Sequence, residues 1–380
     1  MTIEFARQET EPATPLGALL DVFQIRQYFN VLVGAADLSA ALAHDAGFVN
    51  DLRRAVLRLP FERRSTPSIA FPAAEARLPG LGSARVGLVA SGGSGALASI
   101  VGVVRAVEEA GATISVYSLC SGGALFGFPL AAGLSSQETA ELVMGLEPEE
   151  YVDVSWRGMA RAVGSLGRGW AGIIRGDKLE RYFRRHLGDL TLGQLRTPAY
   201  APIWNIETNR LDYLGPRSYP DLPVARAIRT AISLPLFVEP VVLEGGSWCD
   251  GGIVDIFPVH PVLDLEPSVD AVVAINAFYP SEFAGEDESD WQHKPVSIMH
   301  VARQVRSCQH VQLARENLAR LRSATDVELL EPVPYQKVRA TGFYQQFIDN
   351  REWPEFIRAG RLAMCDALRR RHGAWGRQSG

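Results

Sequence analysis

The 380-residue sequence has few cysteines, no long uninterrupted apolar run and no excess of basic residues. Its four cysteines show neither the paired spacing of a metal site nor a disulfide framework, so we expect reduced thiols, a cytoplasmic protein and no cofactor. With a net charge of −5, no strongly basic surface is implied, and we expect no nucleic-acid partner. The composition is that of an ordinary globular protein, since 47% of the residues are hydrophobic and 21% are charged.

The chain also lacks an obvious membrane or export segment. The longest apolar stretch, residues 19–33, is interrupted by Asp21, Arg26 and Gln27, which excludes an ordinary transmembrane helix. Residues 1–15 contain acids and no apolar core, unlike a signal peptide. The stretch 19–33 is amphipathic. We therefore expect this stretch to pack on the core of the protein. Peripheral contact with a membrane surface is the alternative.

Strand and helix patterns alternate from residue 84 onward, which indicates parallel βαβ units and an α/β fold. We predict strands at 84–90, 114–118, 202–207, 241–243 and 271–275, and helices at 16–33, 36–58, 96–110, 122–132, 294–323 and 353–371. Three regions follow from this pattern. Residues 1–82 form a tail and helical extension, residues 83–275 a catalytic domain, and residues 276–380 an acidic loop with C-terminal helices that pack on the core.

A serine lies between the second predicted strand and its helix, in the segment Leu119-Cys120-Ser121-Gly122-Gly123-Ala124-Leu125. Small residues after a serine permit the tight strand-to-helix turn of a nucleophile elbow, which exposes the hydroxyl at a helix N-terminus. The sequence therefore indicates Ser121 as a candidate nucleophile. Such a serine needs an oxyanion-binding loop and a base.

A glycine-rich loop, Ser91-Gly92-Gly93-Ser94-Gly95, follows the first predicted strand and offers several backbone N–H groups to an anion. A dinucleotide site is one reading, but the acid expected at the end of the next strand is missing. A plain βα turn is another. Because adjacent parallel strands bring their following loops together, an oxyanion hole beside Ser121 is the reading that we favour.

An aspartate followed by two glycines, Asp250-Gly251-Gly252, is the third element. The glycines favour a tight turn that leaves the carboxylate pointing into a cleft. In isolation the same tripeptide is a common turn signal, so its meaning depends on the other two motifs.

Together, the glycine loop, the serine elbow and the Asp-Gly-Gly turn resemble the patatin-like phospholipase family. The segments 102–111, 226–235 and 257–259 are also similar to the family, so that the resemblance covers about residues 83–275. It implies a three-layer α/β/α fold with a mostly parallel central sheet. It also implies hydrolysis of carboxylic esters of lipids, which makes a lipid or another acyl ester the expected substrate.

Carried over residue by residue, the resemblance makes Ser121 the nucleophile and Asp250 its general base, a Ser–Asp dyad rather than a triad. The oxyanion would be bound by the backbone around five residues: Gly92, Gly93, Ser94, Gly95 and Gly122. Two positions depart from the family pattern. Leu119 replaces the first glycine of the elbow, and Gly95 or Ala96 stands where a basic residue is usual.

Several alternatives remain open at this point. Ser94 also lies in a strand-to-helix turn and is a rival nucleophile. A Ser–Asp–His triad would need one of the histidines that follow Asp250, which are His260, His293, His300 and His310. The two departures also leave open a catalytically impaired protein that binds acyl ligands or a partner protein. Cys120 and Cys249 are either redox-sensitive thiols or, more commonly, small core residues.

Overall fold

The computed structural model describes residues 69, 71, 84–155, 171–266, 268–283, 298–338, 346 and 349–371. The predicted helices at 16–33 and 36–58, and with them the amphipathic stretch 19–33, lie outside the described residues. In the part of the chain that is described, no helix is both long and apolar enough to cross a bilayer.

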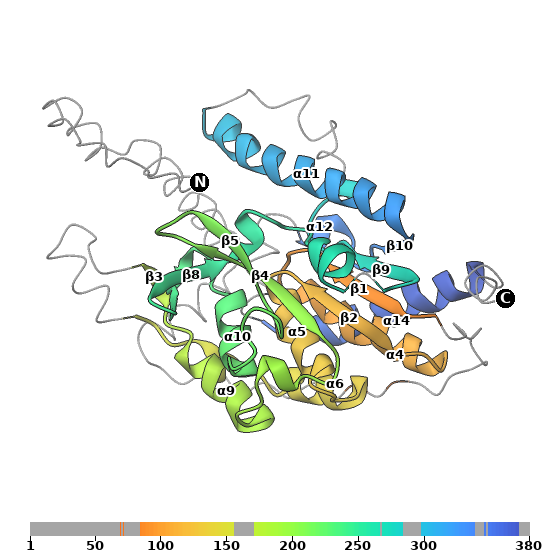
Figure 1. The fold of residues 1–380 in the computed structure, drawn as a ribbon, viewed down its shortest axis with the longest axis horizontal. Helices are drawn as coiled ribbons and strands as arrows, with labels where there is room; N and C mark the ends of the chain where they lie inside the picture. The colour runs from red at the N-terminus through yellow and green to blue at the C-terminus, as the bar shows by residue number, and fades with distance from the viewer. Residues whose placement is uncertain are drawn as a thin grey trace, which may run out of the picture.

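A mostly parallel sheet forms the centre of the fold (Figure 1). The strand order is β10 (Asp326–Leu330), β9 (Ala271–Ile275), β1 (Val86–Ala90), β2 (Ile114–Leu119), β4 (Ala199–Asn205), β8 (Gly246–Asp250) and β7 (Val241–Leu243). Strands from β10 to β4 run parallel, whereas β8, β7 and the additional strand β5 (Arg210–Leu214) pair antiparallel. A separate small sheet joins β3 (Gly172–Ile174) to β6 (Leu236–Val238).

The side chains of β1 point alternately to the two faces of the sheet, and both faces are covered by helices. Leu88 belongs to a core shared with α4 (Ser99–Glu109), α5 (Gly122–Ala131) and α14 (Trp353–Arg370). The next residue, Val89, belongs to a second core that includes residues of α11 (Ile298–Ala324). Successive side chains of a strand point to opposite faces, so a fully apolar strand needs a cover on each side. Figure 1 shows α11 on one side of the sheet and α4 and α5 on the other.

The remaining helices extend the layer formed by α4, α5 and α14. They are α6 (Ser136–Met144), α7 (Pro148–Tyr151), α9 (Asp177–Leu187), α10 (Val224–Ala231) and the short α12 (Tyr335–Val338). Helix α9 packs on α7 and α10. The predicted three-layer α/β/α fold with a mostly parallel sheet is confirmed.

Most predicted elements in the described residues are confirmed within a few positions, and β7 and β9 have the predicted bounds. The strand pattern at 202–207 marks β4, which begins three residues earlier. Sequence reasoning missed β3, β5, β6 and β8, and also β10, a strand of the central sheet that lies between the two C-terminal helices. The division of the chain into three regions stays a prediction.

Candidate active site

Ser121 lies between β2 and α5 in a backbone conformation that L residues rarely adopt, with φ 50° and ψ −120°. Such a conformation costs on the order of 1–3 kcal/mol and persists only where the surroundings impose it. It is the sharp turn expected of a nucleophile elbow, and it leaves the side chain at the N-terminus of α5. Ser121 is 7% exposed, so the hydroxyl lies in a largely water-excluded place.

The glycine loop lies directly beside this turn. Strands β1 and β2 are parallel neighbours in which Ala90 pairs with Leu119, so the loops that follow them meet. The Gly122 N–H donates a hydrogen bond to the Gly93 carbonyl at 3.3 Å. A Cβ at Gly122 would lie 2.6 Å from that oxygen, which explains the glycine after the serine. The structure therefore brings the two predicted loops together.

The N–H groups of the loop differ in their availability. Gly92 N–H donates to the Ile256 carbonyl at 2.6 Å, and Gly122 N–H makes the long bond already described. Within the described residues, the N–H groups of Gly93 and Ser94 donate to no acceptor. These two backbone donors are the ones that an anion beside Ser121 finds unoccupied.

Asp250 ends β8, which reaches the same region through its antiparallel pairing with β4. Its side chain is 1% exposed and accepts a hydrogen bond from Gly252 N–H at 2.8 Å, and the Ser121 side chain lies close enough to lower its pKa. Burial raises the pKa of Asp250 from 3.8 to about 6, although Ser121 and the Gly252 N–H both favour the ionised form. A carboxylate with this pKa is ionised at neutral pH and basic enough to accept a proton.

A buried arginine supports the strand end that carries Asp250. The Asp250 N–H donates to the Ser233 carbonyl at 3.0 Å, and Arg229 donates to Ser233 Oγ. Arg229, 3% exposed, also donates to the carbonyl oxygens of Arg175 and Glu239. Sequence reasoning noted the segment 226–235 only as a likeness and missed this role, because nothing local marks an arginine as buried.

A second buried carboxylate, Asp255, lies behind the site. It accepts hydrogen bonds from Tyr213 Oη at 2.6 Å and from Asn317 Nδ2 at 3.1 Å. Burial raises its pKa. The neighbouring Cys120 thiol donates to the Asp255 carbonyl at 3.6 Å, and burial together with Asp250 and Asp255 raises the thiol pKa well above its ordinary value. Cys120 is therefore a protonated core thiol, which disfavours a redox role.

The described histidine side chains have partners of their own. His260 Nδ1 lies 2.7 Å from Asp264 Oδ2, and His310 Nε2 lies 2.6 Å from the Ile253 carbonyl oxygen. The side chains of His293 and His300 lie outside the described residues. Among the residues that the structure describes, the interactions that set the Asp250 pKa come from Ser121 and Gly252 and include no histidine.

Metal ligands do not gather in the described part of the chain, where no cluster of three or more His, Cys, Asp or Glu side chains is placed to hold an ion. The absence of a cofactor stays a prediction.

Comparison with known proteins supports the family resemblance. The architecture is a three-layer α/β/α fold in which a serine follows one parallel strand and a glycine loop follows its neighbour. The model of the patatin-like phospholipase family matches residues 88–263 of the chain. The predicted resemblance is confirmed.

Two curated relatives have no assigned activity. YqhO of Bacillus subtilis, an uncharacterized protein, is 28% identical over 192 residues, which are 45% of this chain and 64% of YqhO. An uncharacterized NTE family protein of Mycobacterium tuberculosis is 27% identical over 200 residues, 53% of this chain and 51% of that protein. The chain thus matches about half to two thirds of the length of these relatives.

Two solved structures are similar at low sequence identity. VipD from Legionella pneumophila is 14% identical with a TM-score of 0.44, and the match covers 76% of this chain and 67% of VipD. The type III effector protein ExoU is 16% identical with a TM-score of 0.40, covering 78% of this chain and 54% of ExoU.

Proposed function

We propose that this protein is a lipid acyl hydrolase that cleaves carboxylic esters through Ser121 and Asp250. The observation that carries the proposal is the proximity of the Ser121 side chain to the buried Asp250 carboxylate, whose pKa is raised to about 6 by burial while Ser121 lowers it. The family supports the class of reaction and the lipid substrate. Neighbouring features support the same chemistry, since Ser121 occupies a strained elbow and the N–H groups of Gly93 and Ser94 are unoccupied.

The proposed reaction has two halves. Ser121 Oγ attacks the ester carbonyl carbon while Asp250 accepts the hydroxyl proton. The carbonyl oxygen becomes an oxyanion, which the N–H groups of Gly93 and Ser94 stabilise. The intermediate collapses, the C–O bond to the alcohol breaks, and Asp250 returns the proton to the departing alcohol. Water then attacks the acyl-serine with Asp250 again as base, which releases the fatty acid and restores Ser121.

The oxyanion donors should contribute strongly to the rate. Losing one oxyanion donor costs about 10²–10³ in rate in hydrolases of this kind. The glycine loop uses main-chain donors, so the lack of a basic side chain at Gly95 or Ala96 leaves these donors in place. Gly92 and Gly122 contribute to the proposed loop by shaping it, since their N–H groups already donate to Ile256 and Gly93, whereas the Gly95 N–H is a further candidate donor.

Labelling with a fluorophosphonate probe tests the proposal. We expect the probe to label the wild-type protein, to fail on Ser121→Ala, and to react much more slowly with Asp250→Asn. Ser94→Ala should keep its labelling, which separates the two candidate nucleophiles. Folded wild-type protein that takes no label would refute the hydrolase assignment and favour a protein that binds acyl ligands or a partner.

A further inference from the structure

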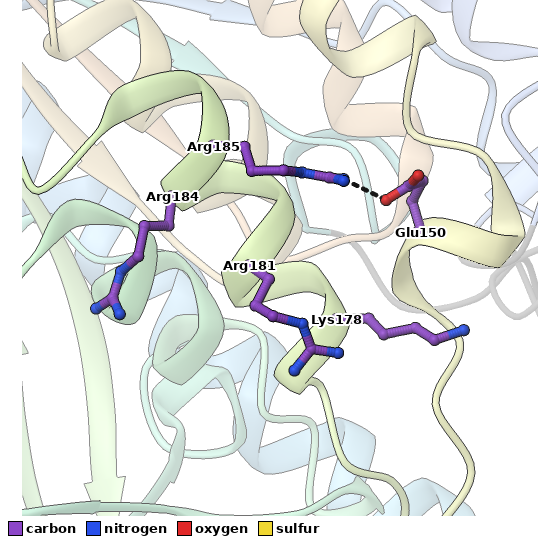
Figure 2. A pocket seen from close by; sticks show the side chains of 5 residues that line it. All are labelled: Glu150, Lys178, Arg181, Arg184 and Arg185. Atoms are coloured by element: carbon purple, nitrogen blue, oxygen red, sulfur yellow. Dashed lines mark hydrogen bonds and ion pairs between the residues drawn. The ribbon is translucent and has the colours of Figure 1, made fainter.

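A basic hollow lies between α9 and α7, outside the candidate active site. It has a volume of about 470 Å³ and is lined by Glu150, Lys178, Arg181, Arg184 and Arg185. Figure 2 shows the four basic side chains projecting from α9 and the single carboxylate, Glu150, facing Arg185 from α7, while Arg184 points away from it. Four cations and one anion give this concave surface a positive charge, although the whole chain is acidic with a net charge of −5.

The pattern of α9 keeps these charges at the surface. Leu179, Tyr182 and Phe183 are buried and attach the helix to the domain. Lys178, Arg181 and Arg185 follow one another at three- and four-residue spacing, which places them on one stripe of the helix. A fixed helix with an apolar inner face and a basic outer stripe presents its cations together.

Acidic neighbours neutralise this stripe only in part. Arg185 pairs with Glu150, and Lys178 has a partner of its own. Arg184 lies 3.4 Å from the exposed Asp189 and 3.8 Å from Glu180 of the same helix. Exposed pairs of this kind add little stability and exchange readily for another anion. Arg181 makes no hydrogen bond or ion pair with the rest of the described chain. The hollow thus retains capacity for phosphate oxygens, which guanidinium groups bind well.

Its position connects the hollow to the candidate active site. The Arg175 carbonyl, just before α9, accepts a hydrogen bond from Arg229, which also holds Ser233 and through it the Asp250 backbone.

We infer that the basic hollow on α9 binds phosphate groups of an anionic phospholipid surface and docks the domain on that surface. The choice of a lipid surface rests on the proposed function, because a lipid hydrolase must reach its substrate at an interface. Docking itself requires no catalysis, so it can fail or succeed independently of the dyad.

Vesicle co-sedimentation of the full-length Ser121→Ala protein tests docking without hydrolysis of the vesicles. Vesicles of phosphatidylcholine with phosphatidylserine should bind the protein, those of phosphatidylcholine alone should bind it less, and added salt should weaken binding. Because each basic side chain near an anionic surface contributes about five-fold in affinity, Arg181→Gln with Arg185→Gln should reduce binding roughly 25-fold. Glu150→Gln should instead strengthen it about five-fold.

The matched control removes two exposed arginines from α14, by Arg358→Gln with Arg369→Gln, and should leave binding unchanged. Circular dichroism of each variant checks that it is folded. Equal binding to both kinds of vesicle, or unchanged binding after loss of Arg181 and Arg185, would overturn the inference. So would an affinity for inorganic phosphate that is lost with these arginines while vesicles are ignored. Fluorophosphonate labelling of the α9 variants separately reports whether the dyad is intact.

Discussion

Ser94 and Gln346 are 252 residues apart in the chain, and Ser94 Oγ donates a 3.1 Å hydrogen bond to Gln346 Oε1. Both side chains are buried. Gln346 is itself held, because its Nε2 donates to the Lys337 carbonyl and its own carbonyl accepts from Trp353 Nε1. Trp353 packs edge to face on Phe126 of α5. The glycine loop is therefore supported by residues well beyond the family-matched segment.

Gln346→Ala should slow catalysis without weakening substrate binding. The substitution leaves the buried Ser94 hydroxyl without an acceptor, which costs about 1–3 kcal/mol and loosens the loop that carries the proposed donors. We expect kcat for an ester to fall about ten-fold with KM unchanged. The exposed Gln312→Ala on α11 is the control. The double variant Ser94→Ala with Gln346→Ala should recover part of the lost stability, and an unchanged kcat in Gln346→Ala would contradict the idea.

The pH dependence of activity should follow Asp250. Its pKa of about 6 means that the carboxylate is protonated, and unable to accept the serine proton, below that pH. Ester hydrolysis should therefore rise with pH through an apparent pKa near 6 and then level off. His260→Ala and His310→Ala should keep the shape of this profile. A profile whose acidic limb moves in either variant would point to a histidine in the reaction.

Ionised Asp250 should also reduce the stability of the fold. Raising a buried carboxyl pKa from 3.8 to about 6 corresponds to about 3 kcal/mol. Between these pH values the native state binds more protons than the unfolded state, so this contribution to stability is present at low pH and lost as pH rises through 6. Asp250→Asn should accordingly unfold at higher urea concentration than wild type at pH 7, with the difference shrinking toward pH 4. A less stable Asp250→Asn at pH 7 would contradict this account.

Leu119 and Gly127 are complementary, which explains why the elbow tolerates a leucine at its first position. Leu119 is fully buried, and a Cβ at Gly127 would lie 2.5 Å from its methyl carbons. We expect Leu119→Ala to destabilise the fold by about 2–5 kcal/mol and Gly127→Ala by about 1–3 kcal/mol. In urea unfolding the double variant should lose less than the sum, because the new methyl group occupies part of the vacated space. Strict additivity would show that the two positions are not coupled.

Local signals explain what could be predicted from the sequence. A strand, a serine and two glycines determine the turn at Ser121. Because β1 and β2 belong to consecutive βα units and pair as parallel neighbours, the glycine loop after β1 lies beside this turn. Asp250 was identified through its glycines and a family likeness. Its pKa was not, because burial depends on the whole fold. The support from Gln346 and Arg229 was missed for the same reason, since each joins segments that no local pattern links.

Strand β10, one of the strands that the sequence pattern did not reveal, has a consequence for solubility. The family match ends at residue 263, before β9, whose five residues Ala271–Ile275 are apolar and buried on both faces. Among the described strands, β10 covers this edge and forms the outer border of the sheet. Its Asp326 and Glu328 place paired charges there, which discourage the addition of a further strand. A shortened chain that ends after β9 would expose the apolar edge of β9, to which another chain could add a strand. By covering this edge, β10 reduces the tendency of the protein to aggregate.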